Sequence, residues 1–136
     1  MKHSEIIRKY YNEIAAAMVE RYRDAVECDG RVQYQIYIWD DGEMSIMEAP
    51  QGDHSYMVAS DFEERELVHV TTIDLGAGFD IWDYSENGKP EDEDEAELMF
   101  KDIVDYLVDS YEESIDELLG GIIADAEQIE RYEEEY

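Results

Sequence analysis

Residues 90–136 read "PEDEDEAELMFKDIVDYLVDSYEESIDELLGGIIADAEQIERYEEEY". Apolar side chains recur in this stretch at spacings of three or four, which places them on one side of a helix with about 100° per residue. The pattern predicts one long amphipathic helix, whose apolar stripe comprises Phe100, Val104, Leu107, Tyr111, Ile115, Leu118, Ile122, Ala126, Ile129 and Tyr132.

Acidic side chains occupy the opposite side of this predicted helix. The stretch holds 19 Asp or Glu and only two basic residues, Lys101 and Arg131. We call the predicted partner-binding surface the carboxylate face and define it as Asp102, Asp105, Asp109, Glu112, Glu113, Asp116, Glu117, Glu127, Glu130 and Glu134. Tyr106, Tyr132 and Tyr136 border it and are candidate interface anchors, because tyrosine is enriched in protein interfaces.

The charge density of this helix distinguishes it from an ordinary solvated surface. Residues 91–136 carry a net charge of −17 over a helix of roughly 69 Å at about 1.5 Å per residue. One strand of B-DNA carries a phosphate about every 3.4 Å, so the two linear charge densities are similar. Like charges three or four residues apart destabilise a helix by a few tenths of a kcal/mol per pair, and a face that served only solubility would mix signs.

The whole chain is acidic and has enough apolar residues to fold. It has 136 residues, 44% of them hydrophobic, and 38 acidic residues against 10 basic ones give a net charge of −28. The length is typical of one domain, 1–136. Such a charge argues against direct binding to nucleic acid or to an anionic membrane and predicts a basic protein partner.

Cysteine content and hydropathy favour a cytoplasmic location. Cys28 is the single cysteine, so an internal disulfide is excluded and a reducing compartment fits. The longest apolar run near the N-terminus is residues 14–19, too short for a signal peptide or a membrane span. The oligomeric state is left open, a homodimer included.

The first part of the chain predicts a helix over residues 4–28. Apolar residues recur there at helical spacing, Ser4 is the expected N-cap, and Asp29 and Gly30 supply the stop. We expect three segments within the domain: a helix over 1–30, an antiparallel sheet over 31–86 and the acidic helical segment over 90–136.

The middle segment predicts about four strands. Residues 32–39 and 43–48 flank an Asp-Asp-Gly turn and predict a hairpin. Residues 56–59 suggest a short strand before a capped helical turn at 60–63, and residues 67–73 are rich in β-branched residues. A Gly-Ala-Gly turn at 76–78 precedes the last expected strand, 79–84.

The predicted fold class is α+β, with helices gathered on one face of an antiparallel sheet. Pro90 is expected in the first turn of the acidic helix, where acidic residues complement the helix dipole. Gly120 and Gly121 cost that helix on the order of 2 kcal/mol relative to alanine. They predict a kink or a split into two helices at this point, and the sequence leaves both open.

Signals for catalysis are weak, so we expect no enzyme and no cofactor. His3, His54 and His69 lack the spacing of metal ligands, and no phosphate-binding loop or nucleophile motif is present. A partial EF-hand pattern is the weak alternative, with candidate calcium ligands Asp83, Ser85, Asn87 and Asp94. Its twelfth position is Asp rather than Glu, and Pro90 stands where an apolar residue is usual.

The helix "FKDIVDYLVDSYEESIDELL" and the tail "RYEEEY" resemble, in character, the acidic C-terminal region of small phage and mobile-element proteins that mimic DNA. These are the phage overcome-classical-restriction protein and acidic anti-CRISPRs. The resemblance covers the last third of the chain and implies a non-catalytic inhibitor of a nuclease in a bacterial cell, of anti-restriction or anti-CRISPR type, that occupies its basic DNA- or RNA-binding channel.

Two other functions fit the same composition. An acidic immunity or chaperone-like protein would bind a basic protein partner without imitating DNA. A calcium-binding domain or a salt-adapted domain is the further alternative. Competition by duplex DNA would separate the DNA mimic from the immunity or chaperone-like protein.

Overall fold

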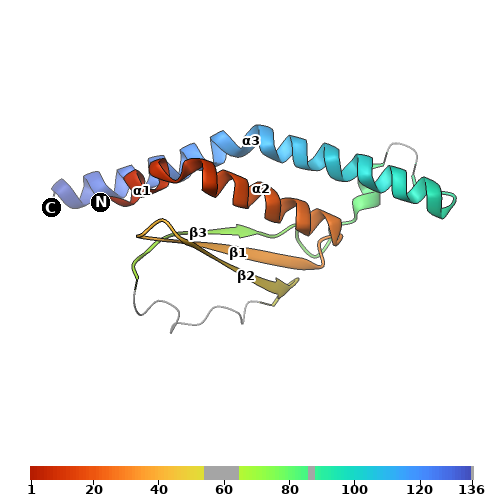
Figure 1. Ribbon diagram of the computed structural model, residues 1–136, viewed down its shortest axis with the longest axis horizontal. Coiled ribbons are helices and arrows are strands. Elements are labelled where there is room, and N and C mark those ends of the chain that lie inside the picture. The colour runs from red at the N-terminus through yellow and green to blue at the C-terminus, as the bar shows by residue number, and fades with distance from the viewer. Residues whose placement is uncertain (54–64, 86–87, 136) are drawn as a thin grey trace.

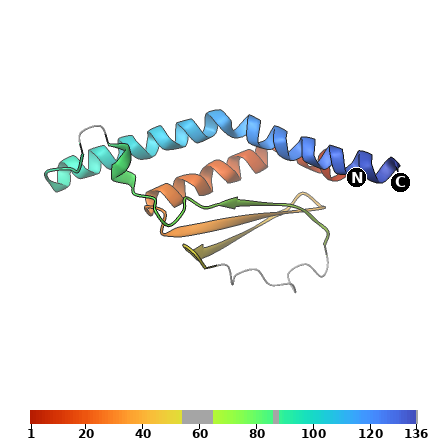
Figure 2. The same cartoon turned by 180° about the vertical axis from the view of Figure 1, so that it is seen from behind.

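The computed structural model describes residues 1–53, 65–85 and 88–135. In these residues α-helices lie on one face of a three-stranded antiparallel sheet (Figure 1), which confirms the α+β class. The N-terminal helices and the long C-terminal helix run side by side, and the two chain ends lie at the same end of the molecule (Figures 1 and 2).

The sheet consists of β1 (Val32–Trp39), β2 (Met44–Pro50) and β3 (Leu67–Ile73), in the order β2-β1-β3. Ile36 in the central strand is paired with Ile46 on one side and Thr71 on the other. The predicted hairpin and the strand at 67–73 are therefore confirmed. The turn between β1 and β2 uses Gly42 at φ 85°, where a side chain is unfavourable.

The prediction of a last strand over 79–84 is wrong. Residues 79–80 belong to no regular element, and the rest form the short 3₁₀ helix η2 (Ile81–Tyr84). Two carboxylates fix that helix, because Asp80 accepts the N–H of Trp82 and Asp29 accepts the N–H of Ile81 at 2.8 Å. The expected strand at 56–59 and the helical turn at 60–63 lie outside the described residues.

The N-terminal helix is divided, so the single helix expected over 4–28 is also wrong. α1 (His3–Lys9) and α2 (Tyr11–Glu27) meet at Tyr10. The Tyr10 ring packs so closely on the hairpin turn that a Cβ atom on Gly42 would lie 2.1 Å from it. The expected stop after α2 is confirmed by positive φ angles at Asp29 and Gly30.

Ser4 is not the helix N-cap that its position suggests. The N-cap of α1 is Lys2, and Ser4 is buried inside the first turn. Its backbone N–H and its hydroxyl both donate to the Glu130 carboxylate, at 3.0 and 2.7 Å. A carboxylate from the C-terminal helix thus satisfies a backbone donor at the start of α1 that the helix itself leaves without a partner.

The C-terminal helix α3 (Glu93–Glu135) is continuous, so the split alternative is wrong. Gly120 and Gly121 are exposed, whereas Leu119 and Ile123 beside them are buried. Packing on both sides of the glycines offsets their low helix propensity. Figure 2 shows α3 as one bowed helix. In the described part of the chain, no helix combines the length and the apolar character that a bilayer crossing requires.

The start of α3 lies three residues after Pro90, which therefore precedes the helix instead of entering its first turn. The Asp92 carboxylate accepts the N–H of Glu95 at 2.7 Å, and the Glu95 carboxylate accepts the N–H of Glu91 at 3.0 Å. This pair of bonds is close to a capping box. Acidic residues fill the first turn as expected.

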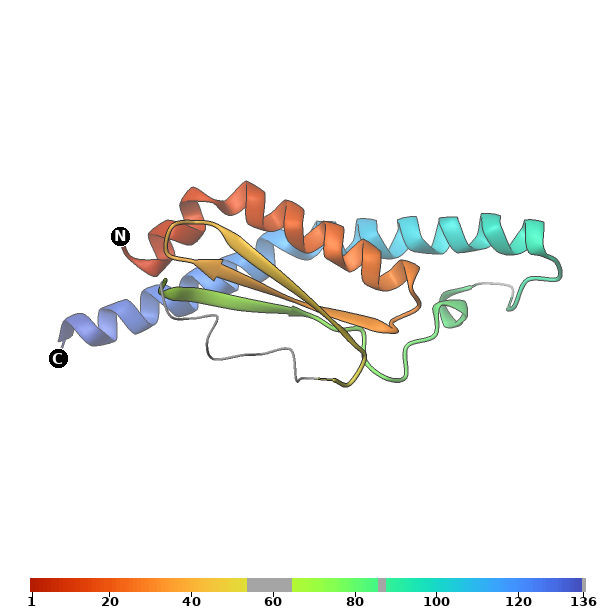
Figure 3. The same ribbon diagram turned by 60° about the horizontal axis from the view of Figure 1, so that its bottom comes forward.

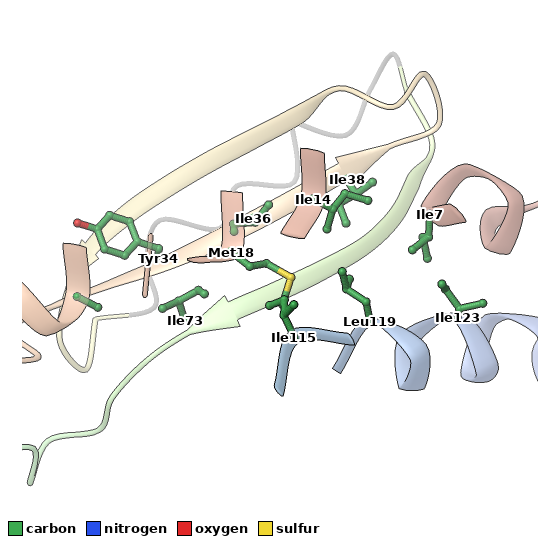
Figure 4. Packing of buried hydrophobic residues seen from close by; sticks show 11 residues of the cluster. Ile7, Ile14, Met18, Tyr34, Ile36, Ile38, Ile73, Ile115, Leu119 and Ile123 are labelled. Carbon is green, nitrogen blue, oxygen red and sulfur yellow. The ribbon is translucent and has the colours of Figure 1, made fainter. Parts of the chain in front are cut away.

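One hydrophobic core joins the helices to the sheet. Side chains of α2 and α3 converge on those of β1 and β3, as Figure 4 shows for Met18, Ile115, Leu119 and Ile36. A second cluster lies where the first half of α3 packs on the end of α2 and on η2; its buried members are Val26, Ile81, Ile103, Val104, Leu107 and Val108. The rings of Tyr22 and Tyr111 stack at 4.1 Å between α2 and α3.

The predicted residues of the apolar stripe of α3 are partly wrong. Leu118, Ile129 and Tyr132 are exposed, whereas Leu119 and Ile123 are buried. Along the helix the buried residues 115, 119 and 123 follow a spacing of four, and such rows wind around the helix axis. The stripe turns because α3 packs obliquely on α1 and α2 (Figure 3).

Candidate functional site

The carboxylate face runs along α3, and toward the C-terminus it meets the side of the helix that packs on α1. Three of its members, Asp105, Glu127 and Glu130, are half-buried. The seven others are exposed: Asp102, Asp109, Glu112, Glu113, Asp116, Glu117 and Glu134. Contacts within the protein divide this set further.

The C-terminal third of the face holds α1 in place. Arg8 forms an ion pair with Glu127, and Lys2 with Glu134. Glu130 accepts the two hydrogen bonds from Ser4, and the bond from the Ser4 backbone N–H is the main reason that its pKa is lowered. These three carboxylates therefore have partners inside the protein, which the spacing of the sequence alone did not show.

Two further members of the face contact α2. Arg23 pairs with Asp105 at 3.2 Å. The Tyr11 hydroxyl donates to Asp116, and this bond is the main reason that the pKa of Tyr11 is raised. Both contacts fix the side-by-side packing of α2 and α3.

The remaining five members form no ion pair or hydrogen bond within the described residues. We call them the free carboxylates: Asp102, Asp109, Glu112, Glu113 and Glu117. They continue the acidic start of α3, so that residues 91–117 hold 13 acidic residues and one basic residue, Lys101. Its helical part, residues 93–117, is about 36 Å long at 1.5 Å per residue.

The surface beside the free carboxylates is hollowed. Asp109, Glu112 and Glu113 line a shallow hollow of about 400 Å³. A groove of about 520 Å³ between α2 and α3 is lined by the apolar residues Ala15, Ala16, Val19 and Ile115 and by the polar residues Asn12, Glu20, Arg23 and Glu112. A partner at this surface would meet carboxylates and an apolar strip together.

A smaller pocket of about 290 Å³ lies where η2 meets α3. Its lining residues are Tyr84, Ser85, Glu95, Met99, Asp102, Ile103 and Tyr106. Tyr84 is 49% exposed and Tyr106 is 65% exposed. Sequence reasoning placed Tyr106 beside the carboxylate face but put Tyr84 in a sheet strand, so this pairing had no sequence signal.

The weak calcium candidates are spread over two elements. Asp83 lies in η2 and Asp94 in the first turn of α3, while Asn87 falls outside the described residues. The Ser85 hydroxyl donates to the Gly88 carbonyl at 2.7 Å. Within the described residues, no group of three or more Asp, Glu, His or Cys side chains is placed to hold a metal ion.

His3, His69 and Cys28 each have neighbouring groups within the described residues. His3 lies 3.0 Å from Glu66 at the edge of a pocket of about 330 Å³ beside α1 and α3. His69 is half-buried in β3, as expected of a packed sheet residue, and burial lowers its pKa. The Cys28 thiol donates to the Ala25 carbonyl at 3.2 Å.

Comparisons with protein-family models, with curated proteins and with solved structures found no match to this chain.

Proposed function

We propose that this protein is a non-catalytic inhibitor that occupies the basic nucleic-acid-binding channel of a nuclease in a bacterial cell. One observation carries the proposal: the five free carboxylates form a run on one rigid helix without an ion pair among the described residues. Because α3 is anchored to α1, α2 and the second hydrophobic cluster, it would present these charges in a fixed arrangement.

The charge density of the stretch supports this function. Residues 93–117 of α3 have a net charge of −10 over about 36 Å of helix, which is one charge per roughly 3.6 Å. One strand of B-DNA carries one per about 3.4 Å. The lysine and arginine side chains that bind phosphates in a nuclease channel would therefore meet a similar charge spacing, and the field would speed association.

The pattern of internal ion pairs supports it as well. Lys2, Arg8 and Arg23 pair with carboxylates at the C-terminal end of α3 and with Asp105, whereas the run from Asp109 to Glu117 has no such ion pair in the described residues and keeps its mutual repulsion. Like charges at such spacings destabilise a helix. A run retained against this cost fits a surface whose counter-charges come from a partner.

The test uses two variants of matched charge. The α3-neutral variant carries Asp109→Asn, Glu112→Gln, Glu113→Gln and Glu117→Gln. The matched control carries four neutralised carboxylates that are exposed and lie outside α3: Glu5→Gln, Glu13→Gln, Asp40→Asn and Glu48→Gln. Each protein is immobilised, exposed to bacterial lysate with and without excess duplex DNA, and its captured proteins are identified by mass spectrometry.

The proposal expects capture of nucleases by the wild type and the control, release of them by DNA, and loss of capture by the α3-neutral variant. The captured nuclease should also lose activity when the wild-type protein is added. Capture that DNA leaves unchanged would contradict the DNA mimic and favour the immunity or chaperone-like alternative. Equal capture by both variants would show that total charge, rather than this face, binds the partner.

A further inference from the structure

We infer that the pocket between η2 and α3 binds an arginine side chain presented by the partner. The inference deepens the proposed function and rests on it, because the basic partner supplies the arginine. The pocket combines two exposed tyrosines, Tyr84 and Tyr106, with two carboxylates, Glu95 and Asp102. Figure 1 shows the two elements that form it, the short green helix and the first half of α3, side by side.

Both carboxylates of the pocket lack a cation in the described part of the chain. Asp102 is one of the free carboxylates. Glu95 uses Oε2 to accept the N–H of Glu91, which leaves its other oxygen for a donor. The pocket floor includes Ile103, which is only 7% exposed. A cation that entered would therefore meet two carboxylates together with aromatic and apolar side chains.

The protein already binds an arginine of its own with the same combination of groups. The Arg65 guanidinium lies 4.8 Å from the centre of the Trp39 ring. Its Nη1 atom is 2.6 Å from a Glu43 oxygen and 3.5 Å from an Asp41 oxygen. An aromatic face and two carboxylates thus suffice in this chain to hold a guanidinium at the surface.

A second internal arginine repeats the arrangement. The Arg21 guanidinium lies 5.7 Å from the centre of the Tyr34 ring and pairs with Asp24 at 3.1 Å. Two arginines, one in α2 and one in the loop before β3, therefore each pack on an aromatic ring and pair with carboxylate. The pocket at Tyr84 and Tyr106 offers these groups while no cation of the described residues pairs with them.

The size and chemistry of the pocket favour arginine over a larger ligand or a lysine. Its volume of about 290 Å³ lies at the lower limit of pockets for drug-sized molecules, which begin at about 300 Å³. A planar guanidinium can stack on a tyrosine ring and donate to carboxylates at the same time, whereas an ammonium is a compact and strongly hydrated charge. Nuclease channels supply arginines for phosphate recognition.

The probe for this pocket is N-acetyl-arginine amide, titrated into the ¹⁵N-labelled protein and followed by amide chemical shifts. Its neutral isostere, N-acetyl-citrulline amide, is the matched ligand control. We expect saturable shifts at Tyr84, Met99, Asp102 and Tyr106 with the arginine amide, and at least fivefold weaker binding of the citrulline amide. N-acetyl-lysine amide should bind more weakly than the arginine amide.

Variants test which groups bind the probe. Tyr106→Ala and Asp102→Asn should each weaken binding at least fivefold, whereas Tyr106→Phe should keep it because the ring face remains. Tyr132→Ala and Asp109→Asn are the matched controls, since Tyr132 is as exposed as Tyr106 and Asp109 is a free carboxylate outside the pocket. Unchanged core amide shifts establish that each variant is folded.

Three results would overturn the inference. These are equal binding of the citrulline amide, shifts spread evenly over the acidic residues of α3, and undiminished binding by Tyr106→Ala. None of them bears on the capture of nucleases by the free carboxylates, which is measured with whole proteins. Conversely, specific arginine binding without any captured nuclease would refute the proposed function and leave the arginine pocket standing.

Discussion

Replacing Gly42 by alanine should destabilise the protein more than the same change at Gly52. Both glycines lie in turns at nearly equal φ angles, 85° and 86°. A Cβ atom at Gly52 would have nothing within 4 Å, but at Gly42 it would lie 2.1 Å from Cε2 of Tyr10. The pair therefore separates backbone strain from the contact between the hairpin turn and the junction of α1 and α2.

The expected magnitudes follow from these two terms. A non-glycine residue in the left-handed region costs about 1–3 kcal/mol, partly offset by about 0.4–1 kcal/mol from the stiffer unfolded chain. We therefore expect Gly52→Ala to cost about 1 kcal/mol. At Gly42 the Tyr10 ring must also move by more than 1 Å to reach an ordinary contact, and the loss of its packing adds about 1–2 kcal/mol.

Urea denaturation followed by circular dichroism measures the free energies of unfolding. In a Tyr10→Ala background the steric part disappears, so Gly42→Ala should then cost no more than Gly52→Ala. Equal costs of the two glycine variants in the wild-type background would refute the contact. A cost at Gly42 that persists unchanged without the Tyr10 ring would do the same.

Three further predictions concern the charges and tyrosines of α3. The α3-neutral variant should have a larger free energy of unfolding than the wild type, by on the order of 1 kcal/mol at low salt, because repulsion at helical spacings is removed. Thermal melts in about 0.01 and 0.3 M NaCl should show that salt reduces this difference in stability. Burial raises the pKa of Tyr111 to about 12, so the folded state retains this proton longer than the unfolded chain. Stability is then complete below about pH 10 and declines toward pH 12; urea midpoints should decline less in Tyr111→Phe, and an equal decline would contradict the buried phenol. The lowered pKa of Glu130 implies stability that is present above about pH 4.5 and lost as pH falls through the lowered value. Glu130→Ala should therefore speed amide hydrogen exchange in α1 at neutral pH without affecting β1, and unchanged exchange in α1 would count against the cap.

Local sequence patterns predicted the elements whose signals are local. The hairpin over 32–50 and the strand at 67–73 have alternating or β-branched residues and a glycine turn, and they form as expected. The stop at Asp29 and Gly30 also follows from the chain itself. The strand predicted over 79–84 was wrong although its apolar alternation was compatible with a strand. The carboxylates of Asp29 and Asp80 accept the backbone N–H groups of Ile81 and Trp82, and these residues form a 3₁₀ helix.

The acidic charge of the C-terminal helix could be predicted from the sequence, because composition and helical spacing do not depend on tertiary contacts. The continuity of the helix through Gly120 and Gly121 could not be predicted from the sequence, because the packing of Leu119 and Ile123 that offsets the glycines is a tertiary contact. The division of the carboxylate face was also hidden. It depends on α1, whose Lys2, Ser4 and Arg8 are more than 115 residues away along the chain.

The sequence by itself therefore determined that a long acidic helix exists, and it led to the prediction of a basic partner. Only the tertiary structure decided which carboxylates are free, because ion pairs and caps form between residues that are distant in sequence and adjacent in space. It also brought Tyr84 of η2 beside Tyr106 and Asp102 of α3. A helical wheel relates residues of one helix only, so it cannot predict a pocket that two elements form together.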